Sequence, residues 1–128
     1  NDAMAIAGLQ GVAPTTDTTS SESELKSLIA KTPDAPYLHF ALGNIYIQQQ
    51  RWPDAERAFF EAYRQDKNRP DFAFNLAICL DHLGQMSPAL HYYETALSLA
   101  MTQTAGFDVE QAKQRISDLR RIIGVPHP

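Results

Sequence analysis

Few residues of this 128-residue chain have the types and spacing that catalysis or metal binding requires. Asp81 and His82 are neighbours, a pairing that could suit an acid–base pair or part of a metal site. Adjacent residues of a helix point about 100° apart, however, and no third ligand follows at a suitable spacing. We therefore interpret both as polar surface residues of a helix, and we expect no metal and no cofactor.

The other reactive side chains also have simpler interpretations. The single cysteine, Cys79, lies on the apolar face of a predicted helix, without the positive charge and exposure that a nucleophilic thiolate needs, so we expect it to be buried. His91 and Glu94 share a helix face and are interpreted as solvated. The sequence has no phosphate-binding glycine loop, no Ser/His/Asp set and no metal-ligand cluster. An enzyme is therefore not expected.

The overall charge excludes two further classes of partner. The net charge is −4 and no cluster of Lys and Arg occurs, so we expect no nucleic-acid partner and no binding to anionic lipid. No apolar run approaches the roughly 20 residues of a membrane span. One cysteine excludes an intrachain disulfide and leaves the redox compartment undecided.

Most of the remaining sequence is organised as a repeat. Residues 36–69 and 70–103 are two copies of one pattern, and adding 34 to a residue number carries one copy onto the other. The identical pairs are Pro36 and Pro70, Phe40 and Phe74, Leu42 and Leu76, Ala55 and Ala89, and Ala62 and Ala96. The conservative pairs are Gly43 and Ala77, Tyr46 and Leu80, and Phe59 and Tyr93. Small residues at fixed positions indicate two helices that approach closely in each copy.

The apolar spacing predicts helices over about residues 36–49, 53–66, 70–83, 88–101 and 107–123. An earlier helix begins at a capping box, Ser21 with Glu24, and stops at Pro33. The other expected caps are Asp34, Asn68 and Ser87 at helix starts and Gly84 at a helix end. Trp52 is expected to pack at the turn of the first hairpin.

These elements predict one domain with short flanks. Residues 1–4 look like a vector remnant, so we expect the chain to be a piece of a longer protein, and residues 1–20 are assigned to that remnant and a flexible linker. The domain covers residues 21–123: a half repeat over 21–33, full repeats over 36–69 and 70–103, and a capping helix over 105–123. Residues 124–128 form a tail.

Residues 36–101 resemble tetratricopeptide repeats, through the Leu42-Gly43 pair, the following Tyr46 and the series Ala55, Phe59 and Ala62. The resemblance implies an all-α, right-handed superhelical solenoid of antiparallel helix pairs, closed by a C-terminal capping helix. It also implies a concave face, lined by the first helix of each repeat, that binds peptides or helices and carries no fixed activity.

Projecting the family's groove onto this sequence gives the candidate peptide-binding residues. They are Tyr37, Phe40, Asn44, Ile47 and Gln48 from the first repeat, Asp71, Phe74, Asn75, Ile78, Asp81 and His82 from the second, and Arg115, with Asp108 and Ala112, from the capping helix. We assign Phe40 and Phe74 to the groove rather than to the core, because both lie opposite the small residues of their helix.

Two narrower resemblances bear on the partner. Tetratricopeptide co-chaperones clamp a terminal carboxylate with two Asn and several cations, but Phe40, Ala105 and Val109 stand where the cations belong, so chaperone-tail binding is not expected. The sequence of residues 40–85 is also similar to C-terminal repeat domains of bacterial type IV pilus biogenesis proteins of the mannose-sensitive haemagglutinin type. That similarity would place the domain at the cytoplasmic or periplasmic face of the bacterial inner membrane.

The sequence therefore predicts a non-catalytic adaptor that binds a peptide, loop or helix of another protein, in the assembly of a bacterial pilus or secretion machine. The alternative is a structural module that oligomerises through its end helices. A short apolar stretch, residues 5–9, could also occupy the groove of its own chain or of a neighbour.

Overall fold

The computed structural model describes residues 16–124. Within this range the chain forms six α-helices and no strand, as the sequence predicts. The helices belong to two compact units that divide between Asp66 and Lys67. Each unit contains one complete pair of helices and one additional helix, and each is described in turn.

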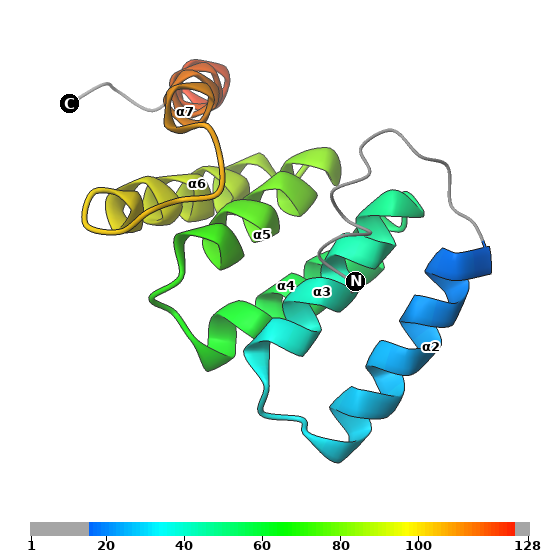
Figure 1. The fold of residues 1–128 in the computed structure, drawn as a ribbon. Helices are drawn as coiled ribbons and strands as arrows, with labels where there is room; N and C mark the ends of the chain where they lie inside the picture. Colours follow the sequence, from blue (N-terminus) through cyan, green and yellow to red (C-terminus); the bar gives the residue numbers. More distant parts are fainter. Residues whose placement is uncertain (1–15, 125–128) are drawn as a thin grey trace. The chain divides into compact units, whose positions relative to one another are not determined.

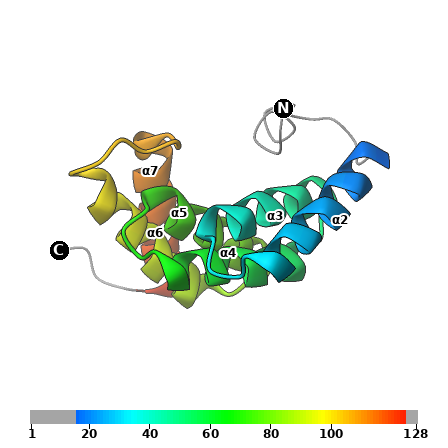
Figure 2. The ribbon, with the colours of Figure 1, turned by 60° about the horizontal axis from the view of Figure 1, so that its bottom comes forward.

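The first unit contains α2 (Thr16–Lys31), α3 (Pro36–Gln48) and α4 (Trp52–Gln65) (Figure 1). The α3 and α4 helices form an antiparallel hairpin, and α2 packs against α3 (Figure 2). The buried apolar side chains of this unit come from all three helices, as the spacing of apolar residues requires. They are Leu25, Ala41, Leu42, Ile45, Tyr46, Ala55, Ala58, Phe59 and Ala62.

The hairpin depends on a close approach at Gly43. A Cβ atom added there would lie 2.6 Å from Cε1 of Phe59, well inside van der Waals contact. Phe59 is fully buried, so its ring has no open space to move into. The absence of a side chain at Gly43 therefore sets how closely α3 and α4 can pack.

Arg51 joins α2 to the turn between α3 and α4. Its guanidinium donates to both oxygens of Glu22 at 3.0 and 3.1 Å and to Asp54 at 2.9 Å. The same group lies over the ring of Tyr46, 4.4 Å from the centroid. Burial would raise the pKa of Glu22, but hydrogen bonds from Lys26 and Arg51 outweigh it and lower that pKa. The sequence analysis did not identify this cluster.

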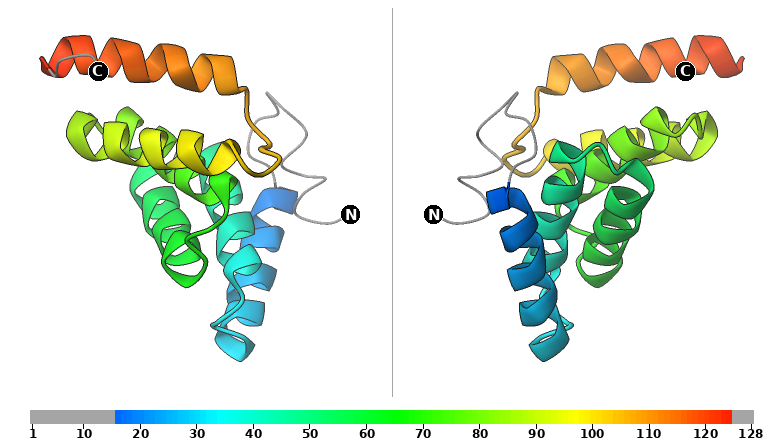
Figure 3. Two further views of the ribbon diagram at one scale, coloured as in Figure 1. Left: turned by 90° about the vertical axis from the view of Figure 1, so that its left-hand side faces the viewer. Right: turned by 90° about the vertical axis from the view of Figure 1, so that its right-hand side faces the viewer.

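The second unit contains α5 (Pro70–His82), α6 (Met86–Ala100) and α7 (Val109–Ile123). The α5 and α6 helices form the second hairpin, and α7 packs on α6 (Figure 3). Cys79 is 0% exposed, which confirms its predicted burial. The other buried apolar residues of this unit are Phe72, Ala73, Leu76, Ala77, Leu80, Ala89, Leu90, Tyr93, Ala96, Ala112, Ile116 and Leu119.

Asp81 connects all three helices of the second unit. Arg115 of α7 donates from Nε and Nη2 to the two carboxylate oxygens, each at 2.7 Å, and the Tyr93 hydroxyl of α6 donates at 2.9 Å. Burial alone would raise the pKa of Asp81, but the hydrogen bonds from Arg115 and Tyr93 outweigh it and lower that pKa. Burial and the neighbouring carboxylate raise the pKa of Tyr93.

Several helix boundaries differ from the sequence predictions. The first described helix begins at Thr16, so Ser21 and Glu24 lie inside α2 and the predicted capping box is wrong, as is the linker assignment of residues 16–20. The predicted caps Asp34, Asn68 and Ser87 are also wrong. The N-cap residues of α3, α5 and α6 are Ala35, Arg69 and Gln85, without side-chain capping bonds.

Proline explains why α3 and α5 begin without a side-chain cap. Both helices have proline at the first position, where its fixed φ suits the helix and its missing N–H removes one donor that would otherwise need a partner. Gly84 has φ 77° just past the end of α5, and this confirms its predicted role. Asp108 caps α7 instead, accepting from the backbone N–H groups of Glu110 and Gln111.

Substituting Gly43 by Ala tests the close approach. An exposed Gly→Ala change inside a helix would stabilise the protein by about 0.5–1 kcal/mol, whereas a clash with Phe59 should destabilise it by about 1–3 kcal/mol. We expect the free energy of unfolding, measured with urea, to fall. A double-mutant cycle with Phe59→Leu should show that the two changes are coupled, and additive effects would place the strain elsewhere.

Substituting Asp81 by Asn tests the three-helix junction. Because its pKa is lower in the folded state, Asp81 stabilises the protein fully above the ordinary carboxyl value of 3.8, and this is lost as the pH falls through the folded value. We expect Asp81→Asn to cost about 1–3 kcal/mol of unfolding free energy at pH 7 and progressively less below pH 3.8.

Urea titrations across this pH range provide the measurement for Asp81. The matched control is Asp118→Asn, which breaks a more exposed pair with Arg121 on α7 and should have a smaller effect. A constant difference between wild type and Asp81→Asn at all pH values would contradict the proposed role of the carboxylate charge.

Candidate functional site

The candidate residues of the first unit share one side of α3. Tyr37, Phe40, Asn44, Ile47 and Gln48 follow one another at helical spacing, and Tyr37 is 55% exposed while the others are half-buried. The Phe40 ring packs against Phe59 of α4, with centroids 5.5 Å apart and planes tilted by 59°. Phe40 is thus anchored on the core and still contributes to the outer surface.

The candidate residues of the second unit share one side of α5. They are Asp71, Phe74, Asn75, Ile78, Asp81 and His82, all half-buried except the exposed His82. The Phe74 ring packs against Tyr93 with centroids 5.7 Å apart and planes at 62°. Phe74 and Tyr93 correspond to Phe40 and Phe59 at the offset of 34, and the two ring pairs have similar geometry. In both repeats, a half-buried aromatic ring therefore packs on a second, buried aromatic ring.

The connection between α6 and α7, residues 101–108, covers part of this α5 face. Phe107 stacks on Phe74 with centroids 4.1 Å apart and planes within 7°. The backbone N–H of Gly106 donates to Asp71 at 2.8 Å, and Gln103 donates to the carbonyl of Asn68 at 2.6 Å. Sequence analysis missed Phe107, although it is the only aromatic residue of this connection.

The end-helix candidates have defined local roles. Arg115 and Asp81 are brought together, but each satisfies the other, so neither is an uncompensated charge. Ala112 is only 1% exposed, and its assignment to the surface is wrong because it lies on the buried face of α7. Asp108 uses its carboxylate to cap the same helix. The described α7 surface therefore offers little to a ligand on this side.

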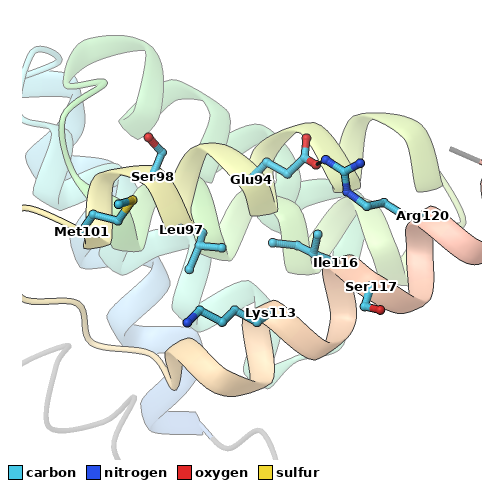
Figure 4. Close-up of a pocket in the computed structure, with 8 residues that line it drawn as sticks. All are labelled: Glu94, Leu97, Ser98, Met101, Lys113, Ile116, Ser117 and Arg120. Carbon is cyan, nitrogen blue, oxygen red and sulfur yellow. Dashed lines mark hydrogen bonds and ion pairs between the residues drawn. The ribbon is translucent and has the colours of Figure 1, made fainter. Parts of the chain in front are cut away.

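An open groove of about 490 Å³ lies between α6 and α7 (Figure 4). Its apolar lining is Leu97, Met101 and Ile116, and its polar lining is Glu94, Ser98, Lys113, Ser117 and Arg120. Glu94 and Arg120 form an ion pair at one end, as Figure 4 shows. The sequence analysis did not identify this groove, because the offset of 34 does not describe α7.

The described side chains of this region are held mainly by ring contacts and ion pairs. Among residues 16–124 there is no group of three or more His, Cys, Asp or Glu side chains that could hold a metal ion. None of the helices in the same range is long and apolar enough to cross a membrane. Aromatic surfaces anchored on a core, with amides beside them, are instead suited to burying apolar side chains of another polypeptide.

Solved structures with the same fold include several bacterial secretion proteins. The chain is similar to a structure described as a T3SS complex from Aeromonas hydrophila, with 16% identity, a TM-score of 0.77 and coverage of 86% of this chain and 74% of the other. It matches PcrH in complex with the chaperone binding region of PopD at 18% identity and TM-score 0.77, covering 94% and 90%.

A third solved structure is the Yersinia enterocolitica type III secretion translocator chaperone SycD, with 14% identity, a TM-score of 0.77 and coverage of 96% of this chain and 84% of the other. These low identities show a shared fold. No curated protein matches the sequence significantly.

A family model supplies the closer relationship. The model described as tetratricopeptide repeat matches residues 16–70 and again residues 40–104. The two matches together extend from the start of α2 to the connection after α6 and therefore include both hairpins. The chain belongs to the tetratricopeptide repeat family.

Proposed function

We propose that this domain is a non-catalytic adaptor that binds an extended peptide or a helix of another protein through α3 and α5. The observation that carries the proposal is the repeated aromatic pair, Phe40 on Phe59 and Phe74 on Tyr93. In each pair the ring on the first helix is only half-buried, whereas its partner on the second helix is fully or almost fully buried.

Such a surface suits moderate, reversible binding. A half-buried ring held by a fixed neighbour loses little side-chain entropy when a ligand covers it, so apolar burial contributes directly to affinity. Asn44, one helical turn after Phe40, has an amide that can both donate to and accept from a peptide backbone. Micromolar affinity for a flexible ligand is typical of this balance.

Solved structures with this fold support the same class of function. One is PcrH bound to the chaperone binding region of PopD, and another is the complex of CopN with Scc3. The resemblance of residues 40–85 to pilus biogenesis proteins points to a related context. We therefore place the adaptor in the assembly of a bacterial pilus or secretion machine, on the cytoplasmic or periplasmic side of the inner membrane.

Site-specific photo-crosslinking tests the binding surface. A photoreactive phenylalanine analogue replaces Tyr37 on α3 or, as a matched exposed control, Arg57 on α4. In lysate of the source cell we expect a discrete protein adduct from the Tyr37 position and none from Arg57. Adding Asn44→Ala and Phe40→Ala should reduce the adduct at least tenfold, with folding checked by circular dichroism. Equal labelling from both positions would move the interface away from α3.

A structural role is the second candidate, and the groove between α6 and α7 favours it. Met101, which lines this groove, is 81% exposed, and Ile122 of the same unit is 57% exposed. Exposed apolar side chains beside an open groove are typical of surfaces that associate with another chain. In this case a second copy would cover the groove. The proposed role of residues 5–9 in covering a surface lies outside the described residues.

Light scattering separates the two candidates. If the groove joins two copies, the measured mass should rise above 14.3 kDa as the protein concentration increases, because association follows mass action. The Met101→Lys variant should then return the mass to that of the monomer, while Arg57→Ala should leave association unchanged. A concentration-independent mass of one chain would exclude the structural role for this domain.

A further inference from the structure

The connection over residues 101–108 binds the α5 face as a peptide ligand would. It contributes an aromatic side chain, Phe107, that stacks on Phe74, and a backbone N–H, from Gly106, that donates to Asp71. Phe74 and Asp71, which these two groups contact, are both among the residues expected to bind a partner. The structure therefore contains one occupant of the proposed surface, supplied by the chain itself.

We propose that the α5 face is specific for an extended peptide containing a glycine followed by an aromatic residue, and that Gly106-Phe107 occupies this place until a partner segment of the same type displaces it. The inference rests on the proposed function, and it adds the chemistry of the ligand and a competitor built into the chain. We refer to Asp71 and Phe74 together as the aromatic seat.

The residue before the aromatic ring is restricted by Asp71. A Cβ atom added to Gly106 would lie 2.9 Å from Oδ2 and 3.2 Å from Oδ1 of that carboxylate. A larger residue would require the end of the Asp71 side chain to shift, and this shift would lengthen the 2.8 Å bond from the backbone N–H. Glycine therefore preserves this hydrogen bond, and on this ground the aromatic seat favours it.

The aromatic residue is selected by the rings around Phe74. Phe74 is fixed from one direction by Tyr93, with the planes at 62°, and presents its face to Phe107, with the planes at 7°. A flat ring covers this face fully, whereas a branched aliphatic side chain would leave part of it exposed. The carboxylate of Asp71 adds an acceptor for the backbone N–H of the glycine that precedes the ring.

The connection can leave the aromatic seat without unfolding α7. Arg115, farther along α7, is held to Asp81 by two hydrogen bonds of 2.7 Å, and Ala112 and Leu119 of α7 are buried. Residues 101–104 are exposed, and the connection meets α5 through the Phe107–Phe74 stack and the Gly106–Asp71 hydrogen bond. Displacement therefore breaks this ring stack and the hydrogen bonds from Gly106 and Gln103.

The first unit does not share this selectivity. At the offset of 34, Phe40 corresponds to Phe74, but Tyr37 corresponds to Asp71. A phenol replaces the carboxylate that accepts the Gly106 N–H, so the requirement for glycine is confined to α5. The second unit should accordingly select a glycine–aromatic pair, whereas the first unit, taken by itself, should accept a less restricted apolar residue.

A peptide of residues 103–109, Gln-Thr-Ala-Gly-Phe-Asp-Val, tests the inference directly as a ligand supplied from solution. Its binding is followed by chemical-shift changes of α5 amides in wild type and in Phe107→Ala, with folding checked by circular dichroism. We expect Phe107→Ala to bind the peptide at least fivefold more tightly, because the wild-type ring competes at a millimolar effective concentration. Gly106→Ala in the protein provides a second, milder way to loosen the connection.

Two altered peptides and one double variant complete the test. Replacing the peptide's phenylalanine by alanine should abolish binding, replacing its glycine by alanine should weaken binding at least fivefold, and Phe74→Ala in the Phe107→Ala background should abolish it. Equal binding to wild type and Phe107→Ala, or no shift changes in α5 with either loosened variant, would overturn the inference. The Tyr37 crosslinking result is independent, so adapter function and aromatic-seat specificity can fail separately.

Discussion

The close contact between Gly43 and the ring of Phe59 determines how closely the helices of the first hairpin can pack. In the first unit Gly43 of α3 meets Phe59 of α4, and in the second unit Ala77 stands at the position of Gly43 and Tyr93 at that of Phe59. Because these rings lie deep in their hairpins, they can support another ring from beneath. The half-buried Phe40 is held by Phe59 in this way. Packing between paired helices and presentation of a binding surface thus depend on the same contact.

The second unit shows how a surface of this kind behaves when it is occupied. Phe74 makes an edge-to-face contact with Tyr93 and a stacked contact with Phe107, so one ring connects the core to the outer connection. The structural role and the binding role of Phe74 are therefore not alternatives. A half-buried ring can pass a shift in its outer contact on to the hairpin that it packs against. This follows because a closely packed interior has little free space to absorb a displacement.

The sequence predicted the helices and their pairing because the repeated residues are mostly buried ones. The size and spacing of buried residues are strongly constrained by packing. The sequence analysis failed at the predicted N-terminal caps, although Gly84 was correct at the end of α5. In α3 and α5, proline at the first position makes a capping side chain unnecessary. The sequence analysis also missed Phe107 and the cluster around Arg51, since a contact between a connection and a distant helix leaves no period in the sequence. The candidate residues on α3 and α5 remain a prediction about binding, although their placement on one side of each helix follows from spacing alone.

The ion pair between Asp81 and Arg115 joins residues that are 34 positions apart, the length of one repeat. One repeat earlier the corresponding residue is Ile47, so the first repeat carries no charge at this position. Duplicating residues 70–103 in tandem would set one aspartate beside another and leave a carboxylate without its cation. The carboxylate of the second repeat thus suits a following helix that carries a cation, so α7 completes the second unit in a way that another copy of the repeat would not.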